Sequence, residues 1–214
     1  MRPARARSYR LSIGARGELR LSVPPRASLK RALGWAQQHE GWVRTQMAKR
    51  PDTVLLCDGA RVPVEGRNLH IRWLAGAART VRIEGDGLLL GGPADGVAPR
   101  VVRWLKARAR TVLEEETRAM AADHGLTVAS VGIGDPRSRW GSCTSDGAIR
   151  YSWRLILCPP DVRRATVAHE LAHLLHMDHS RAFHDAHARI LDADPAPARA
   201  WLRLNGSGLH RYIG

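Results

Sequence analysis

The chain has 214 residues and a formal net charge of +14, from 34 Lys and Arg against 20 Asp and Glu. This length favours one domain, with room for a small subdomain and a substantial core. Three cysteines, none of them in a C-x-x-C pair, exclude a disulfide framework and a cysteine-based zinc site. The Arg-rich start has no apolar segment and no run reaches membrane length, so we expect a cytoplasmic protein without a membrane partner.

Most of the excess charge lies at the start of the chain. Residues 1–50 contain 12 Lys and Arg but only 2 Asp and Glu. Such a segment is typical of a surface for nucleic acid or another polyanion. However, Arg outnumbers Lys by 31 to 3 along the whole chain, which indicates a general bias of composition. The aromatic motifs of RNA-binding modules are also missing. We therefore expect non-specific association with nucleic acid at most.

Turn residues and hydrophobic periodicity divide the first two thirds of the chain into elements. Ser28 suits the N-cap of a helix that Pro51 ends, and Gly125 suits the end of a second, longer helix. The predicted elements are strands at 9–13 and 18–23, a helix at about 28–49, short strands within 54–90, a loop at 91–99, a helix at about 100–124 and a strand at 127–134. The strands predict a β-rich basic subdomain at 1–95 and a second domain at 96–214.

A further helix is predicted from residues 159–161 to 177–178, and it contains the pattern H-E-x-x-H. Apolar residues occupy most of its faces, which is typical of a buried helix. Residues four apart lie about 40° apart around a helix axis, so His169 and His173 point to one side, as two zinc ligands must. Glu170 lies between them in the sequence and can act as the general base toward a zinc-bound water.

A catalytic zinc usually has three protein ligands, so a third must come from elsewhere. We choose His179, which follows His173 by six residues and lies beyond the predicted end of the helix. Asp178 suits a turn there, and Ser180 suits the N-cap of a following helix. This spacing equals that of the metzincins, but His176 replaces their Gly and no Met-turn follows, which excludes that class. For His176, one turn after His173, we favour a packing or hydrogen-bonding role over that of a ligand. Lesser candidate ligands on the next helix are His184, Asp185 and His187.

Several ordered motifs in the second half of the chain resemble those of the YgjP-like metallopeptidases, small bacterial zincins related to the SprT-like group. The motifs are Ser138–Cys143, Tyr151–Pro160, His169–Leu174, Asp178–Ser180 and Phe183. The resemblance implies that His169, His173 and His179 bind zinc and that Glu170 is the base. Two positions depart from the family pattern, since Asp178 stands where Asn is usual and His184 where Trp is usual.

The residues around Trp140 precede the active-site helix and have two interpretations. In the first interpretation, they lie on an edge strand that lines the cleft, where a substrate peptide adds as a further strand. Arg139 or Arg150 then holds a substrate carboxylate or phosphate, or an oxyanion. Alternatively, Trp140 only packs on the helix and Gly141 only permits a tight backbone. Residues expected near the substrate or around the zinc ligands are Arg139, Trp140, Ser142, His176 and His184.

Together, these patterns predict an α+β fold with a zincin-like catalytic domain, in which the H-E-x-x-H helix lies beside a small mixed sheet. We expect one zinc per chain, a Glu-activated water and a peptide or protein substrate. A second hypothesis is a metal-dependent hydrolase of nucleotide phosphoanhydrides, which the many arginines would suit. A third is a basic nucleic-acid-associated module with a structural zinc, closed by a fourth ligand such as His176 or Asp185.

Overall fold

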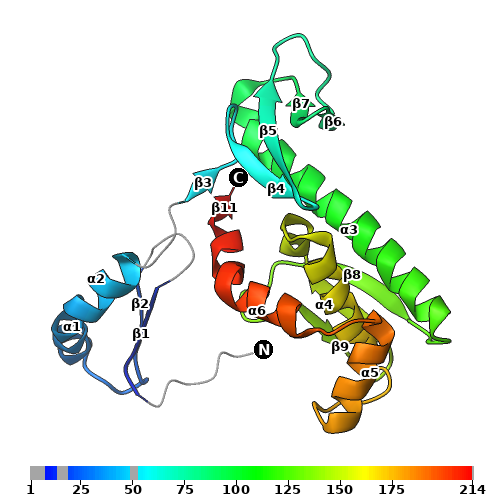
Figure 1. Ribbon diagram of the computed structural model, residues 1–214. Helices are drawn as coiled ribbons and strands as arrows, with labels where there is room; N and C mark the ends of the chain where they lie inside the picture. Colours follow the sequence, from blue (N-terminus) through cyan, green and yellow to red (C-terminus); the bar gives the residue numbers. More distant parts are fainter. Residues whose placement is uncertain (1–7, 14–18, 49–52, 214) are drawn as a thin grey trace. The chain divides into compact units, whose positions relative to one another are not determined.

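A computed structural model describes residues 8–13, 19–48 and 53–213, and the chain forms two compact units at Met1–Asp52 and Thr53–Gly214 (Figure 1). The units divide at 52/53, whereas the sequence analysis placed the boundary at 95/96. The difference has a physical reason. Apolar side chains from residues 56–90 join the same buried core as those of the helices and strands after residue 96.

The first unit contains two strands and two helices. Strand β1 (Arg10–Ile13) pairs antiparallel with β2 (Leu19–Ser22), and the turn predicted between them lies outside the described residues. The single helix predicted at 28–49 is instead α1 (Leu29–Gln38) followed by α2 (Glu40–Ala48). The ring of His39 donates to the Trp35 carbonyl, and the backbone amide of His39 donates to the carbonyls of Ala36 and Gln37. Because the side chain takes the carbonyl that a continuous helix would use, α1 ends there.

The second unit contains a four-stranded sheet of order β4-β5-β7-β6. In the hairpin between β4 and β5, Glu65 and Gly66 have φ of 51° and 79°, as a type I′ turn requires. A further two-stranded sheet joins the two ends of this unit in parallel. The strands of these sheets are β3 (Val54–Leu55), β4 (Arg61–Val64), β5 (Arg67–Trp73), β6 (Arg82–Glu84), β7 (Gly87–Leu90) and β11 (Tyr212–Ile213).

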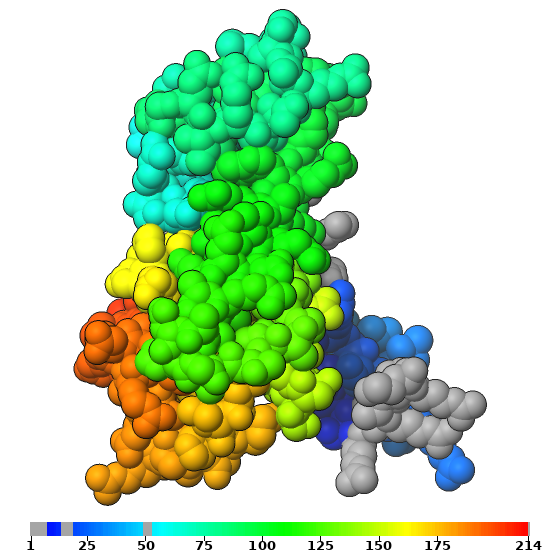
Figure 2. Space-filling view, turned by 90° about the vertical axis from the view of Figure 1, so that its right-hand side faces the viewer, coloured from blue at the N-terminus to red at the C-terminus, as the bar shows by residue number. Residues whose placement is uncertain are grey.

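The short 3-10 helix η1 (Ala94–Gly96) leads into the long helix α3 (Val97–Asp123), which packs one face on the core. Its other face is exposed along its length (Figure 2). Thr117 lies on the buried face, donates to the Leu113 carbonyl and bonds the hydroxyl of Tyr151 at 3.0 Å. This buried bond ties α3 to the second sheet of the unit.

That second sheet has the order β8-β10-β9, with β8 parallel and β9 antiparallel to β10. Within the described residues, β9 therefore lies at an edge. Helix α4 packs against β9, α3, α5 and α6 (Figure 1). The elements are β8 (Ser130–Gly134), β9 (Gly141–Cys143), β10 (Ala148–Ser152), η2 (Trp153–Leu157), α4 (Pro160–Ala172), α5 (Arg181–Leu191), α6 (Ala196–Asn205) and η3 (Gly206–Arg211).

The buried guanidinium of Arg154 connects the end of the chain to this core. It donates to Asp135 at 2.8 Å and to the carbonyls of Leu209 and Tyr212 at 2.8 and 3.0 Å. Burial raises the pKa of Asp135, but the hydrogen bonds and charge of Arg154 outweigh it and leave that pKa below its usual value.

The described elements form a mixed α+β fold with a long helix and small sheets. None of the helices in the described part of the chain is long and apolar enough to span a membrane.

Candidate metal centre

Helix α4 carries the H-E-x-x-H pattern and is buried on most of its faces. It begins with Pro160 in its first turn and Asp161 beside it, as the sequence predicts. It ends at Ala172, several residues earlier than the predicted 177–178, and His173 is its C-cap. The next amides, of Leu174 and Leu175, bond carbonyls three residues back, so the chain turns instead of continuing the helix.

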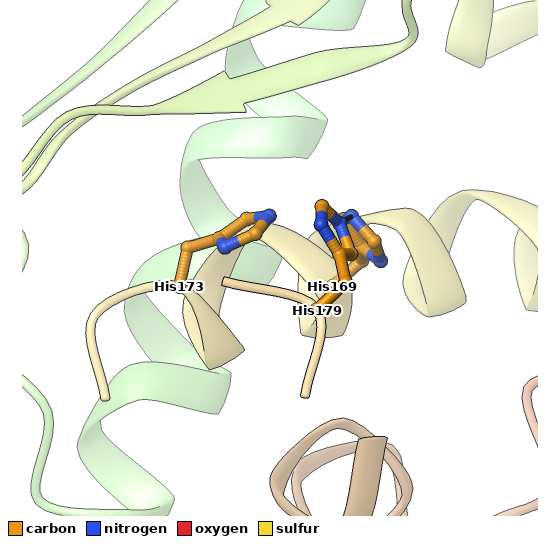
Figure 3. A group of neighbouring side chains, drawn as sticks. All are labelled: His169, His173 and His179. Atoms are coloured by element: carbon orange, nitrogen blue, oxygen red, sulfur yellow. Dashed lines mark hydrogen bonds between the residues drawn. The ribbon is translucent and has the colours of Figure 1, made fainter. Parts of the chain in front are cut away.

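This turn brings three imidazoles together (Figure 3). One ring nitrogen each from His169, His173 and His179 lies within 4.8 Å of the others, and Nε2 of His169 and of His179 are 3.4 Å apart. Asp178 accepts from the Ser180 amide, and Ser180 caps α5, which fixes the direction of the loop that carries His179. His179 comes from outside α4, as the sequence analysis expected of a third ligand.

Two of the three histidines have the spacing of zinc ligands, and two have a pKa that suits metal binding. Two nitrogens bound about 2.0–2.1 Å from a tetrahedral zinc are about 3.3 Å apart, close to the 3.4 Å between His169 and His179. Metal binding needs neutral imidazoles. Burial and the neighbouring histidines lower the pKa of His169 to about 3, and burial lowers that of His173. Both rings therefore remain neutral near pH 7.

Surrounding groups hold these rings in place. Nδ1 of His173 donates to the His176 carbonyl at 3.1 Å, which leaves Nε2 to face a metal. The fully buried ring of Phe183 lies with its centroid 4.5–4.9 Å from those of all three histidines. His187 donates to the Ala165 carbonyl at 3.0 Å, and its ring centroid is 5.2 Å from that of His169. These contacts preorganise the donor set.

Glu170 follows His169 on α4 and has only 4% of its surface exposed. Burial raises the pKa of Glu170 to about 7, against the opposing charge of Arg139. Its carboxylate faces β9 so closely that a Cβ on Gly141 would lie 2.3 Å from Oε1. Only glycine leaves room for the carboxylate in this position.

Glu170 and His169 line one cavity of about 230 Å³. Helix α6 closes one side of it, and Trp140 packs on Gly206, where a Cβ would lie 2.7 Å from the indole. We call this the Glu170 cavity. Its lining residues are Arg139, Trp140, Gly141, Ala165, Thr166, His169, Glu170, His187, Ala198, Arg199 and Leu202.

The structure brings together some of the expected residues and not others. Arg139 and Trp140 line the Glu170 cavity, whereas Ser142 lies on β9 opposite Arg150 and is not part of the lining. His176 contributes its carbonyl to His173 and not a third or fourth donor nitrogen. His184 is exposed, and its ring centroid is 6.5 Å from that of His179.

Sequence reasoning missed the contribution of α6, which supplies Ala198, Arg199 and Leu202 to the cavity. Ala198 and Leu202 are four residues apart, and this spacing indicates an apolar helix face. It does not indicate that the face closes a cavity beside Glu170.

The fold and the donor set define an α+β protein with a three-histidine candidate metal site. The model of the YgjP-like metallopeptidase domain family matches residues 7–205, so the chain belongs to this family. Among solved structures, the metallopeptidase zymogen of Pyrococcus abyssi abylysin is similar at a TM-score of 0.39 and 17% identity, over 44% of this chain and 95% of that chain. No curated protein matches the sequence.

Proposed function

We propose that this protein is a zinc-dependent metallopeptidase with a zincin-like catalytic unit. His169, His173 and His179 hold one zinc ion, and Glu170 is the general base. The observation that carries the proposal is a group of three imidazole nitrogens within 4.8 Å of one another, together with the buried carboxylate of Glu170, which lines one cavity with His169. Membership of a metallopeptidase family supports it.

A zinc ion in this donor set supplies a Lewis acid that polarises a scissile carbonyl and makes a bound water more acidic. Glu170 takes a proton from the attacking water and returns it to the leaving nitrogen. Its burial suits this task, because a raised pKa lets the same carboxyl group both accept and release a proton near neutral pH. The edge strand β9, next to Glu170, offers backbone groups with which an extended peptide can pair.

The number of donors favours catalysis over a purely structural role. Among the described residues the donor group has three members, whereas structural zinc sites use four protein ligands. Neither residue expected to close a structural site belongs to this group. Asp185 instead lies 3.9 Å from Arg181 on the exposed face of α5.

The test compares the parent with Glu170→Gln. The zinc content of both is measured by plasma mass spectrometry, and cleavage of a peptide library is followed by liquid chromatography with mass spectrometry. We expect equal zinc and equal melting temperatures, with hydrolysis reduced by roughly 10²-fold or more. Nucleoside triphosphates are included as substrates. Turnover of nucleotides without any peptide cleavage would overturn the choice of substrate, and unchanged turnover in the variant would overturn the role of Glu170.

A further inference from the structure

The Glu170 cavity combines an apolar wall with two cationic residues at its margin. Trp140, Ala198 and Leu202 provide apolar surface, while Arg139 enters from the segment before β9 and Arg199 from α6. The two arginines are 60 residues apart in the sequence, and both are exposed residues that line the cavity.

Neither arginine has a hydrogen bond or ion pair from its side chain to any described residue. Arg163 and Arg154, by contrast, are buried and paired with Glu116 and Asp135. Both unpaired arginines line the cavity together with Glu170 and His187.

The cavity therefore has an excess of positive charge. Glu170 is the only acidic residue in its described lining, and Thr166 uses its hydroxyl to bond the Val162 carbonyl. A ligand group that fills this space meets apolar surface along its stem and two guanidinium groups with free donors at its end. Guanidinium groups bind carboxylates through charge-assisted, often bidentate hydrogen bonds.

We propose that the Glu170 cavity binds a substrate residue that carries a carboxylate, next to the peptide bond that is cleaved. The carboxylate belongs either to an Asp or Glu side chain or to the free C-terminus of the substrate. Arg139 and Arg199 are then the residues that determine specificity. This inference rests on the proposed peptidase function for the reaction, but the binding of the carboxylate can be measured apart from it.

The size of the cavity favours a single amino-acid residue. The cavity has a volume of about 230 Å³. It lies below the ~300–1,000 Å³ of pockets that enclose drug-sized ligands. A side chain with its carboxylate fits this space.

The test uses the zinc-loaded full chain and a set of peptides that differ at one position, scanned along the sequence as Glu, Gln, Leu or Lys. Each peptide is made with a free and with an amidated C-terminus, so the two sources of the carboxylate are separated. We expect kcat/KM to be about tenfold higher for one carboxylate-bearing peptide than for its neutral partner, equivalent to about 1.4 kcal/mol. Arg139→Gln and Arg199→Gln should each reduce this ratio toward one.

Arg203→Gln is the matched control, because it removes the same charge from α6 at an exposed position outside the cavity lining. It should leave the ratio unchanged. Binding is measured separately by fluorescence anisotropy of labelled peptides with zinc-loaded Glu170→Gln, in which turnover is expected to be roughly 10²-fold slower or more. The same preference for the carboxylate, lost in the arginine variants, should appear there.

The outcomes separate the two proposals. Peptide cleavage with no carboxylate preference, or with a preference that both arginine variants retain, overturns the assignment of the cavity and leaves the peptidase function intact. Arginine-dependent binding of the carboxylate without cleavage of any peptide supports the cavity and overturns the peptidase function. Arginine-dependent binding of a nucleoside triphosphate, with none of any peptide, overturns both.

Discussion

Substituting Gly141 by alanine should disable Glu170 without removing a single catalytic atom. The new Cβ would lie 2.3 Å from Oε1, 2.6 Å from Cδ and 2.7 Å from Cγ of Glu170. Ordinary contact begins at 3.4 Å, so the carboxylate must move by about 1 Å. Overpacking of this kind costs about 1–3 kcal/mol of stability, and a misplacement of about 1 Å can cost roughly 10²-fold in rate.

The assay compares Gly141→Ala with Gly132→Ala in the same sheet, where a Cβ meets no atom closer than 3.7 Å. We expect Gly141→Ala to keep its zinc, to melt slightly earlier and to lose about 10²-fold in peptide hydrolysis, mainly in kcat. Gly132→Ala should behave as the parent. Full turnover in Gly141→Ala would refute the placement of Glu170 as the base, and loss of zinc would show that the substitution acts through the metal site instead.

Three further predictions concern other parts of the chain. His179→Ala should abolish tight zinc binding in a chelator competition assay, whereas His176→Ala should change it little; the reverse order would contradict the choice of third ligand. Asp135→Asn leaves the buried Arg154 without its carboxylate and should lower the free energy of unfolding at pH 7 by about 1–3 kcal/mol. Because the folded pKa of Asp135 is lowered, its contribution is present above the unfolded value of about 3.9 and is lost as pH falls through the folded pKa, so denaturation curves of the two proteins should converge in acid. Any binding of DNA or RNA by the basic residues 1–50 should fall steeply with salt in gel-shift titrations and show no sequence preference.

The parts of the candidate site that follow from short-range geometry could be predicted from the sequence. His169 and His173 share a helix face because they are four residues apart, and the turn chemistry of Asp178 and Ser180 returns His179 to them. The prediction of where α4 ends was less accurate. Apolar residues continue the pattern past Ala172, but Leu175 is 44% exposed and contributes little to the core. The periodicity of apolar residues in a sequence does not show whether each of them is buried in the core.

Contacts between residues far apart in the sequence could not be predicted from its patterns. The structure confirms short strands within residues 54–90. Their apolar side chains, however, belong to the core of the larger unit, so the two units divide at 52/53. Arg199 shows the same limit, since no pattern in α6 connects it with Arg139 or with Glu170. The predicted helix at 28–49 is divided because the ring of His39 competes for the backbone carbonyl of Trp35. Helix propensity does not predict a hydrogen bond of this kind.

The three histidines lie within eleven consecutive residues, from His169 to His179. The cavity beside them is different, because it requires Arg139 to Gly141 on one side and α6 on the other. A chain in which α6 and β9 no longer pack together therefore still contains all three histidines close together in the sequence, and these can bind a metal ion. Metal bound by the unfolded chain reduces the stabilisation that metal gives to the folded one. A variant with a full complement of zinc can thus lack an assembled cavity, and zinc stoichiometry alone is a poor measure of whether this protein is folded.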